Sequence, residues 1–307
     1  MTPPRSIAVV GSGIAGLGAA WLLSRRHAVT LFEAGERLGG HTHTHDIELQ
    51  GRRYAVDSGF IVSNPQHYPL LTRLFAELDV ATQPTTMSFS VHDARSGLEY
   101  NAGSLGGLFC QRRNLVRPRF WRMLADLRRF YREAPAVLGS PHAALTLGAY
   151  LQRQGYSDTF RDQHLVPMAS ALWSSPSQRI LEFPMGQLIG FMANHHMLQV
   201  TGRPQWQVVR GGSRRYVEAL RARWRVDERL ATPVLAVERL ADGVRLVSAR
   251  GEERFDDVVL ACHADEALAL LGDASAPEQE ILGAIGYQDN ETVLHTDARV
   301  LPRDRRA

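Results

Sequence analysis

Short apolar runs alternate with glycine turns and a helical segment at the start of the chain. Residues 7–10 are four consecutive apolar side chains, a length typical of a buried parallel strand. Residues 15–26 are rich in Ala and Leu and end in two arginines, which favours a helix with basic residues at its negative C-terminal end. Residues 28–32 form the next apolar run. This order of strand, helix and strand predicts an α/β fold with a parallel sheet.

The same type of pattern returns in the last third of the chain. Ser213 is expected to cap a helix, and three short alternating segments between residues 233 and 255 predict a three-stranded β-meander. Residues 258–262 are again apolar and would rejoin the parallel sheet. Residues 1–80 and 205–265 should therefore form one discontinuous domain.

The segment between these two parts lacks the pattern. Residues 81–204 predict two short strands and then an amphipathic helix at 119–133. We expect this segment, together with residues 266–307, to form an inserted α+β substrate domain that is incomplete at its C-terminal end. A further helix is predicted before the insertion, with Asn64 as its cap and Pro65 in its first turn.

Three glycines follow the first predicted strand in the spacing G-x-G-x-x-G: Gly11, Gly13 and Gly16. The first would allow a sharp turn, the second would let the backbone approach a pyrophosphate, and the third would permit close packing of helix and strand. Glu33 lies 20 residues after Gly13, at the end of the second strand, where a carboxylate would accept hydrogen bonds from a ribose. Its charge would repel a 2′-phosphate, which disfavours NADP. The alternative is a structural turn that binds no nucleotide.

A second motif follows Glu33 directly and extends the pattern to E-A-x-x-R-x-G-G-H-T. Its members are Ala34, Arg37, Gly39, Gly40, His41 and Thr42. This motif resembles the FAD-binding signature of the flavin amine oxidase, protoporphyrinogen oxidase and phytoene desaturase superfamily. A guanidinium and two bare glycines beside the pyrophosphate can contact the flavin half of FAD, which a domain for NAD alone does not need. Taken alone, the arginine could lie on a solvated loop; together with the first motif it favours FAD over NAD, with a Rossmann-like domain binding it.

The resemblance extends over almost the whole chain and implies further cofactor contacts. An Asp-x-Gly at Asp57 to Gly59 and a Gly-Gly pair at Gly211 and Gly212 match segments that approach the cofactor in that superfamily, and Val234 matches a backbone contact with adenine. The implied FAD-binding residues are Gly11, Gly13, Ile14, Ala15, Gly16, Glu33, Ala34, Arg37, Gly39, Gly40, His41, Thr42, Asp57, Gly59, Gly211, Gly212 and Val234.

The end of the chain departs from the resembled superfamily. Its members continue for about another hundred residues, a length comparable with a small domain, and supply a final glycine-rich segment at the flavin ring. No segment here matches it. The resemblance therefore predicts either a truncated chain or a second chain that completes the site.

Composition narrows the chemistry. A length of 307 residues with 44% hydrophobic side chains suits about two domains with a large core. The formal charge is +3, and every basic side chain is Arg, since the sequence contains no Lys. The lysine that flavin amine oxidases place near the flavin is thus absent, and covalent catalysis by Lys is excluded. The arginines are spread along the chain rather than gathered in one stripe, so we expect no nucleic-acid partner.

Cysteine and histidine patterns indicate no metal site. Cys110 and Cys262 are far apart and form no metal or redox motif. His41, His43 and His45 would share one face of an extended segment, but no cysteine or carboxylate pattern supports a metal there. The chain shows no signal peptide and no apolar run of membrane-spanning length, so we expect a cytoplasmic protein.

The substrate side is less defined. Trp173 and His195 lie in apolar segments, 165–176 and 191–200, that suit a pocket wall and equally an ordinary core. They are the weak catalytic candidates, because histidine titrates nearest neutral pH. The arginine-rich helix at 119–133 could rest on a membrane surface, inner face included, although packing on its own domain is favoured.

The sequence therefore predicts an FAD-dependent oxidoreductase that removes a hydride from a C–C or C–N bond of a small or lipid-like substrate. Similarity to bacterial amine-oxidase-like proteins, which are often encoded beside cyclopropane-fatty-acid-synthase-like methyltransferases, implies an acyl chain. The alternatives are an amine oxidase, a non-catalytic FAD-binding fragment, and an NAD-binding Rossmann protein.

Overall fold

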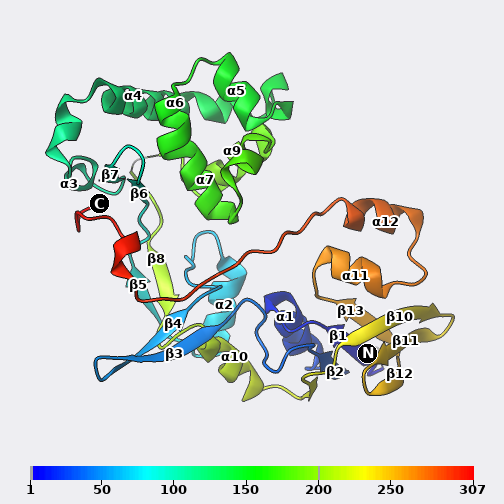
Figure 1. Ribbon diagram of the computed structural model, residues 1–307. Helices are drawn as coiled ribbons and strands as arrows, with labels where there is room; N and C mark the ends of the chain where they lie inside the picture. Colours follow the sequence, from blue (N-terminus) through cyan, green and yellow to red (C-terminus); the bar gives the residue numbers. More distant parts are fainter. Residues whose placement is uncertain (1–2, 200) are drawn as a thin grey trace. The chain divides into compact units, whose positions relative to one another are not determined.

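The computed structural model describes residues 3–199 and 201–307, and they divide into two compact units (Figure 1). Unit 1 comprises the chain through Pro84 together with Gln207–Glu291. Unit 2 comprises Thr85–Trp206 and Thr292–Ala307. The first two of the three crossings between the units lie in two short strands that pair with each other, β5 (Thr82–Thr85) and β8 (Trp206–Val209), and the third follows Glu291.

Unit 1 is built on a four-stranded parallel sheet, as the apolar runs predict. Its strand order is β13-β1-β2-β9, and every neighbouring pair is parallel. The interior of β1 is buried on both faces, which explains its continuous apolar sequence. The strands are β1 (Ser6–Val10), β2 (Ala28–Phe32), β9 (Val226–Arg229) and β13 (Asp257–Leu260).

The predicted β-meander is also confirmed. The meander is antiparallel, with the order β10-β11-β12 and a tight turn into Gly243. A separate antiparallel hairpin, β3 with β4, turns at Gln50 and Gly51, both at positive φ. The bounds are β10 (Val234–Leu240), β11 (Gly243–Ser248), β12 (Gly251–Phe255), β3 (Thr44–Leu49) and β4 (Arg52–Asp57).

Five helices accompany these sheets among the described residues of unit 1. Leu17 of α1 and Leu220 of α10 are fully buried in the same core cluster as Val9 and Leu31 of the parallel sheet. The helices are α1 (Ile14–Leu23), α2 (Pro69–Glu77), α10 (Arg214–Arg221), α11 (Ala264–Leu270) and α12 (Ala276–Gly283).

One predicted helix start is wrong, and one helix that starts as predicted lacks the expected cap bond. Asn64 accepts hydrogen bonds from the amides of His67 and Tyr68, which closes a turn, and α2 begins only at Pro69. Ser213 does not cap α10 with its own side chain, because its hydroxyl donates to Asp57 instead. In both cases a local capping signal is satisfied by another partner.

Residues 266–291 lie in unit 1, whereas we expected them in the substrate domain. The reason is contact with the meander. Leu271 forms a β-bridge with Val237 of β10, and Arg239 of β10 forms ion pairs with Asp273 and with Glu278 of α12. These contacts hold α11 and α12 beside β10.

Unit 2 is mainly helical around one large apolar cluster, with one antiparallel strand pair, β6 (Ser90–Asp93) and β7 (Leu98–Asn101). Tyr100, Phe130 and Phe160 are among its fully buried side chains. The α-helices are α3 (Leu105–Leu108), α4 (Pro118–Glu133), α5 (Leu147–Arg153), α6 (Asp158–Phe160), α7 (Val166–Trp173), α8 (Ser177–Leu181) and α9 (Met185–Asn194). The short 3-10 and π segments are η1 (Arg112–Val116), η2 (Ala134–Val137), η3 (Pro141–Ala144), η4 (Arg161–Leu165) and η5 (Ala298–Val300).

The predicted helix at 119–133 is confirmed as α4, which starts one residue earlier at Pro118. Of the two apolar segments proposed as pocket walls, the first contains α7 and the second contains the end of α9. Val200, the last residue of the second segment, lies outside the described residues. None of the helices that the structure describes is both long and apolar enough to cross a bilayer.

Candidate functional site

A groove of about 710 Å³ opens in unit 1 where β1, β2 and β13 end. The carboxyl ends of parallel strands are where open α/β sheets bind ligands. The groove brings together nine of the predicted cofactor residues: Gly11, Gly13, Ile14, Ala15, Glu33, Ala34, Gly40, His41 and Val234. The other residues that line it are Val10, Ser12, Phe32, Thr232, Pro233, Ala261, Cys262, His263, Glu266, Ala269 and Leu270.

The glycine turn has the geometry that its three glycines suggest. Gly11 has a φ of +95°, and a Cβ there would lie 2.7 Å from the Ala261 carbonyl oxygen. A Cβ on Gly16 would lie 1.9 Å from the Gly11 carbonyl oxygen, so this position in α1 admits only glycine. A Cβ on Gly13 would meet no described atom within 4 Å beyond its chain neighbours. Gly13 is therefore the glycine whose open side could face a ligand.

The start of α1 is suited to an anion. Gly13 is its N-cap residue, and no side chain caps the helix there. The first amides of a helix have no intrahelical acceptor, and they carry the positive end of the helix dipole. Since Ile14 and Ala15 line the groove, these amides can be offered to a phosphate.

The second motif folds against the first. The Gly39 amide donates to the Ser12 carbonyl at 3.0 Å, and a Cβ on Gly40 would lie 2.9 Å from the Gly13 Cα. Arg37 donates to two backbone carbonyls, those of Gly40 at 2.8 Å and Thr42 at 2.9 Å. The guanidinium therefore fixes the loop that covers the glycine turn.

Glu33 lines the groove, and its carboxylate accepts hydrogen bonds from neighbouring residues. Its Oε2 accepts hydrogen bonds from the amide, at 3.0 Å, and from the hydroxyl of Ser12. Its Oε1 accepts from the Gly35 amide at 2.8 Å. Each carboxylate oxygen has two lone pairs, so Oε1 keeps capacity for a ribose hydroxyl.

Eight of the predicted cofactor residues are not among those that line the groove: Gly16, Arg37, Gly39, Thr42, Asp57, Gly59, Gly211 and Gly212. Several support its walls. A Cβ on Gly59 would lie 1.9 Å from the His41 carbonyl oxygen. The Thr42 hydroxyl is 2.5 Å from the hydroxyl of Tyr216, whose pKa is raised by burial.

Asp57 joins β4 to the start of α10. Both of its carboxylate oxygens accept from the Ser213 amide at 3.0 Å, and Oδ1 also accepts from the hydroxyls of Ser213 and Thr44. Thr44 in turn accepts from the Arg214 amide at 3.0 Å. Gly212 packs so tightly on Thr44 that a Cβ would lie 2.4 Å from its Cγ2. These residues cap α10 from the neighbouring hairpin.

Sequence reasoning missed the loop after β13. Cys262, His263 and Glu266 line the groove, and burial followed by the charge of Glu266 raises the pKa of the Cys262 thiol. The thiol thus stays protonated and is not poised as a nucleophile. The position of this loop directly after a parallel strand was the available signal.

Three exposed rings stack in a row at this loop. His263 stacks on Tyr287 at a centroid distance of 4.4 Å and on His41 at 5.9 Å. The Tyr287 hydroxyl accepts from the Ala264 amide at 3.0 Å. The segment after α12 is thereby anchored to the first turn of α11.

The two catalytic candidates lie in unit 2. Trp173 and His195 both pack on the ring of Phe191, at centroid distances of 4.7 and 4.1 Å. The His195 Nδ1 is 3.0 Å from the Phe191 carbonyl oxygen. These contacts are those of an aromatic cluster at the end of α9.

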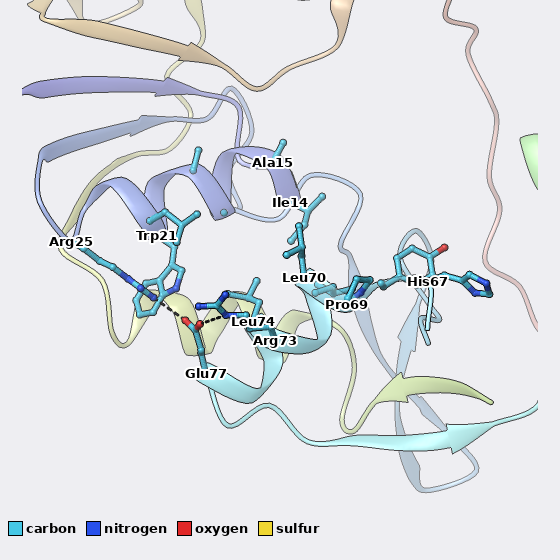
Figure 2. Close-up of a pocket in the computed structure, with 15 residues that line it drawn as sticks. Ile14, Ala15, Trp21, Arg25, His67, Pro69, Leu70, Arg73, Leu74 and Glu77 are labelled. Atoms are coloured by element: carbon cyan, nitrogen blue, oxygen red, sulfur yellow. Dashed lines mark hydrogen bonds and ion pairs between the residues drawn. The ribbon is translucent and has the colours of Figure 1, made fainter. Parts of the chain in front are cut away.

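A second cavity of about 660 Å³ lies between α1 and α2 (Figure 2). Its lining is largely apolar, and Figure 2 shows Leu70 and Leu74 of α2 with Trp21 of α1 around it. Arg25 and Arg73 both pair with Glu77 at 2.9 and 3.0 Å, which closes the polar end of the cavity. It offers few hydrogen-bonding groups, so it is not a dinucleotide site.

Comparisons with known proteins identify the family of the chain. The family model described as "Flavin containing amine oxidoreductase" matches residues 14–295. The carotenoid phi-ring synthase of Chlorobaculum tepidum is 36% identical over 89 residues, 29% of this chain and 14% of that protein. Cyclohexylamine oxidase from Brevibacterium oxydans has a similar structure, with a TM-score of 0.68 and 20% identity over 92% of this chain and 63% of that one.

A fatty acid isomerase from P. acnes that produces CLA is also similar in structure, with a TM-score of 0.57 and 16% identity over 92% of this chain and 64% of that one. At these identities the structural likeness shows the fold alone. The chain spans less than two thirds of the length of either solved structure. Because the family model covers most of the sequence, the chain belongs to the flavin-containing amine oxidoreductase family.

Proposed function

We propose that the groove of unit 1 holds the adenosine and pyrophosphate half of FAD, the cofactor of this family, and that the whole protein is an FAD-dependent oxidoreductase. The observation that carries the proposal is the open side of Gly13 at the uncapped start of α1. A phosphate there would accept hydrogen bonds from the first amides of the helix. Family membership supports the same cofactor.

Each residue around this point has a task that its contacts support. Glu33 would accept a hydrogen bond from the ribose while it holds Ser12 in place. Arg37 would keep the loop of Gly39 and Gly40 against the turn, so that the backbone stays close to the pyrophosphate. Val234 lines the groove at the meander and would contact the adenine.

When bound, FAD supplies the hydride acceptor, and the protein contributes binding, orientation and exclusion of water. We propose a C–C or C–N bond of a small or lipid-like molecule as the bond oxidised. The similar proteins carry names of both kinds, a cyclohexylamine oxidase on one side and a carotenoid synthase and a fatty acid isomerase on the other.

The absence of Lys favours the C–C reaction on an acyl chain over amine oxidation, because a lysine at the flavin is part of the amine oxidase pattern that this sequence resembles. Amine oxidation stays the second candidate, since the family is named for it.

The test uses the full chain reconstituted with FAD. A flavin absorbance spectrum that is shifted from free FAD, and that bleaches anaerobically with an unsaturated fatty acid but not with primary amines, is the expected result. Bleaching with amines and release of peroxide in air would establish the second candidate. A chain that leaves the spectrum of free FAD unchanged would refute the assignment of the groove.

A further inference from the structure

Four large apolar side chains within a short stretch of unit 2 are exposed. Leu105 of α3 and Val116 of η1 are 77% and 81% exposed, and Leu115 and Trp121 are about half exposed. They belong to the stretch of chain from α3 to the first turn of α4, which runs along one edge of the unit in Figure 1. We call this set the 105–121 face.

Local contacts link parts of this face. The Trp121 indole donates to the Leu115 carbonyl at 2.8 Å, and the indole ring packs on Phe109 at a centroid distance of 5.5 Å. The Phe109 amide donates to the Leu105 carbonyl, one helical turn away. Burial of such side chains is worth about 1.5–3 kcal/mol each, so a cluster left in water indicates a surface with a partner.

All charged side chains in the stretch around this face are positive. Residues 105–125 contain five arginines and no Asp or Glu. Arg122 is 4.0 Å from Asp126, and Arg113 donates to the Gly97 carbonyl. Within the described ranges 3–199 and 201–307, the side chains of Arg112, Arg117 and Arg119 form no hydrogen bond or ion pair. Their charges are thus left for an external anion.

Two of these arginines flank a hollow of about 540 Å³, which is also lined by Ser96, Thr159 and Gln163. Asp93, the carboxylate beside it, already accepts hydrogen bonds from Ser96 at 2.7 Å and Gln163 at 2.9 Å. Arg117 and Arg119 remain the uncompensated charges at this hollow. Guanidinium groups without a carboxylate partner suit a phosphate group.

We infer that the 105–121 face docks on an anionic lipid bilayer, with Leu105, Val116 and Trp121 inserted among the acyl chains and Arg117 and Arg119 on lipid phosphates. Trp and Arg side chains are typical of the headgroup region of a membrane interface. Single-stranded RNA would also attract the arginines, but it is bound by stacking on aromatic rings, and the exposed residues here are mostly aliphatic. The inference does not depend on flavin binding.

The experiment is flotation of the full chain with vesicles of phosphatidylcholine alone and with phosphatidylglycerol added. Binding to the anionic vesicles only, weakened by salt, is expected. Replacing both arginines, Arg117→Gln with Arg119→Gln, should weaken binding about 25-fold, at about fivefold for each charge near an anionic leaflet. Leu105→Ser with Val116→Ser should weaken it at least about tenfold, since two inserted side chains are lost.

Matched controls come from unit 1. Leu70 is 79% exposed and the Arg53 side chain 91% exposed. Leu70→Ser and Arg53→Gln therefore remove an exposed apolar side chain and an exposed charge outside the 105–121 face. They should bind like the unaltered chain. The inference is overturned if the unaltered chain does not float with anionic vesicles, or if the controls lose as much binding. It is equally overturned if Leu105→Ser with Val116→Ser has no effect, or if a mixed-sequence RNA binds more tightly than the vesicles.

Discussion

Three glycines around α1 provide the sharpest test of the groove, because a single methyl group is expected to have a different effect at each. Gly16→Ala would place Cβ 1.9 Å from the Gly11 carbonyl oxygen, far inside van der Waals contact. Gly18→Ala, in the same helix, meets no described atom within 4 Å, and neither does Gly13→Ala. The helix and the chemistry of the substitution are the same for the first two, so the comparison isolates the contact.

The expected magnitudes follow from these distances. Overpacking against backbone costs about 1–3 kcal/mol or more, and alanine gains about 0.5–1 kcal/mol over glycine in a helix. Gly16→Ala should therefore lower the free energy of unfolding by about 2 kcal/mol, a large share of a typical stability of about 5–15 kcal/mol. Gly18→Ala should raise it by about 0.5–1 kcal/mol.

Gly13→Ala separates binding from stability. Its backbone angles, φ −63° and ψ 178°, are accessible to alanine, so the unfolding free energy should stay almost unchanged. The methyl group would project where the pyrophosphate approaches, and the affinity for FAD should fall at least about tenfold. Urea unfolding followed by circular dichroism and titration of FAD fluorescence give the two quantities. Equal stability of the Gly16 and Gly18 variants, or unchanged FAD affinity of Gly13→Ala, would refute the reasoning.

Four further results are expected. Arg37→Lys should weaken FAD binding about tenfold, because an ammonium cannot bridge the carbonyls of Gly40 and Thr42 as the fork of guanidinium donors does; full affinity in a fluorescence titration would contradict this. Tyr216→Phe should lower the unfolding free energy by about 1–2 kcal/mol, since the buried Thr42 hydroxyl loses its partner, whereas Tyr54→Phe on the exposed hairpin should change it little. Asp57→Asn should cost about 1–3 kcal/mol in urea unfolding, because an amide NH₂ accepts no hydrogen bond at the start of α10. Burial lowers the pKa of His164 to about 4, below its value near 6.5 in the unfolded chain, so the contribution of His164 to stability should be full above pH 6.5 and fall as the pH drops toward 4. The urea midpoint of the unaltered chain should therefore decrease more between pH 7 and pH 5 than that of His164→Gln. Identical decreases would disprove this.

The parts of the groove that could be predicted from the sequence are those whose determinants are close together in the chain. Gly11, Gly13 and Gly16 act within one turn, and Glu33 ends the strand that follows. Periodicity likewise placed the sheet and the meander, because a buried parallel strand needs a continuous apolar run. These features are local, so their signals are local.

What could not be predicted depends on partners far along the chain. The Asp57 carboxylate accepts from the Ser213 amide, 156 residues away in sequence, and this replaces the cap that Ser213 seemed fit to give. The boundary at residue 266 was missed because ion pairs from Arg239 to Asp273 and Glu278 depend on the tertiary position of β10. The local sequence indicates that a residue can cap a helix or that a segment can be a linker. It does not identify the distant group that will bind that residue or segment instead.

The hydrogen bonds of Glu33 to Ser12 and of Arg37 to the loop of Gly40 have a thermodynamic consequence. They order the turn before any ligand arrives, so association loses little conformational entropy in this part of the chain. Because FAD would bind the folded state and not the unfolded one, it raises the free energy of unfolding by mass action. The increase is about 2.7 kcal/mol at a free FAD concentration one hundred times the Kd. Unit 1 should thus melt at a temperature that rises with the logarithm of FAD concentration, while its groove keeps the same shape.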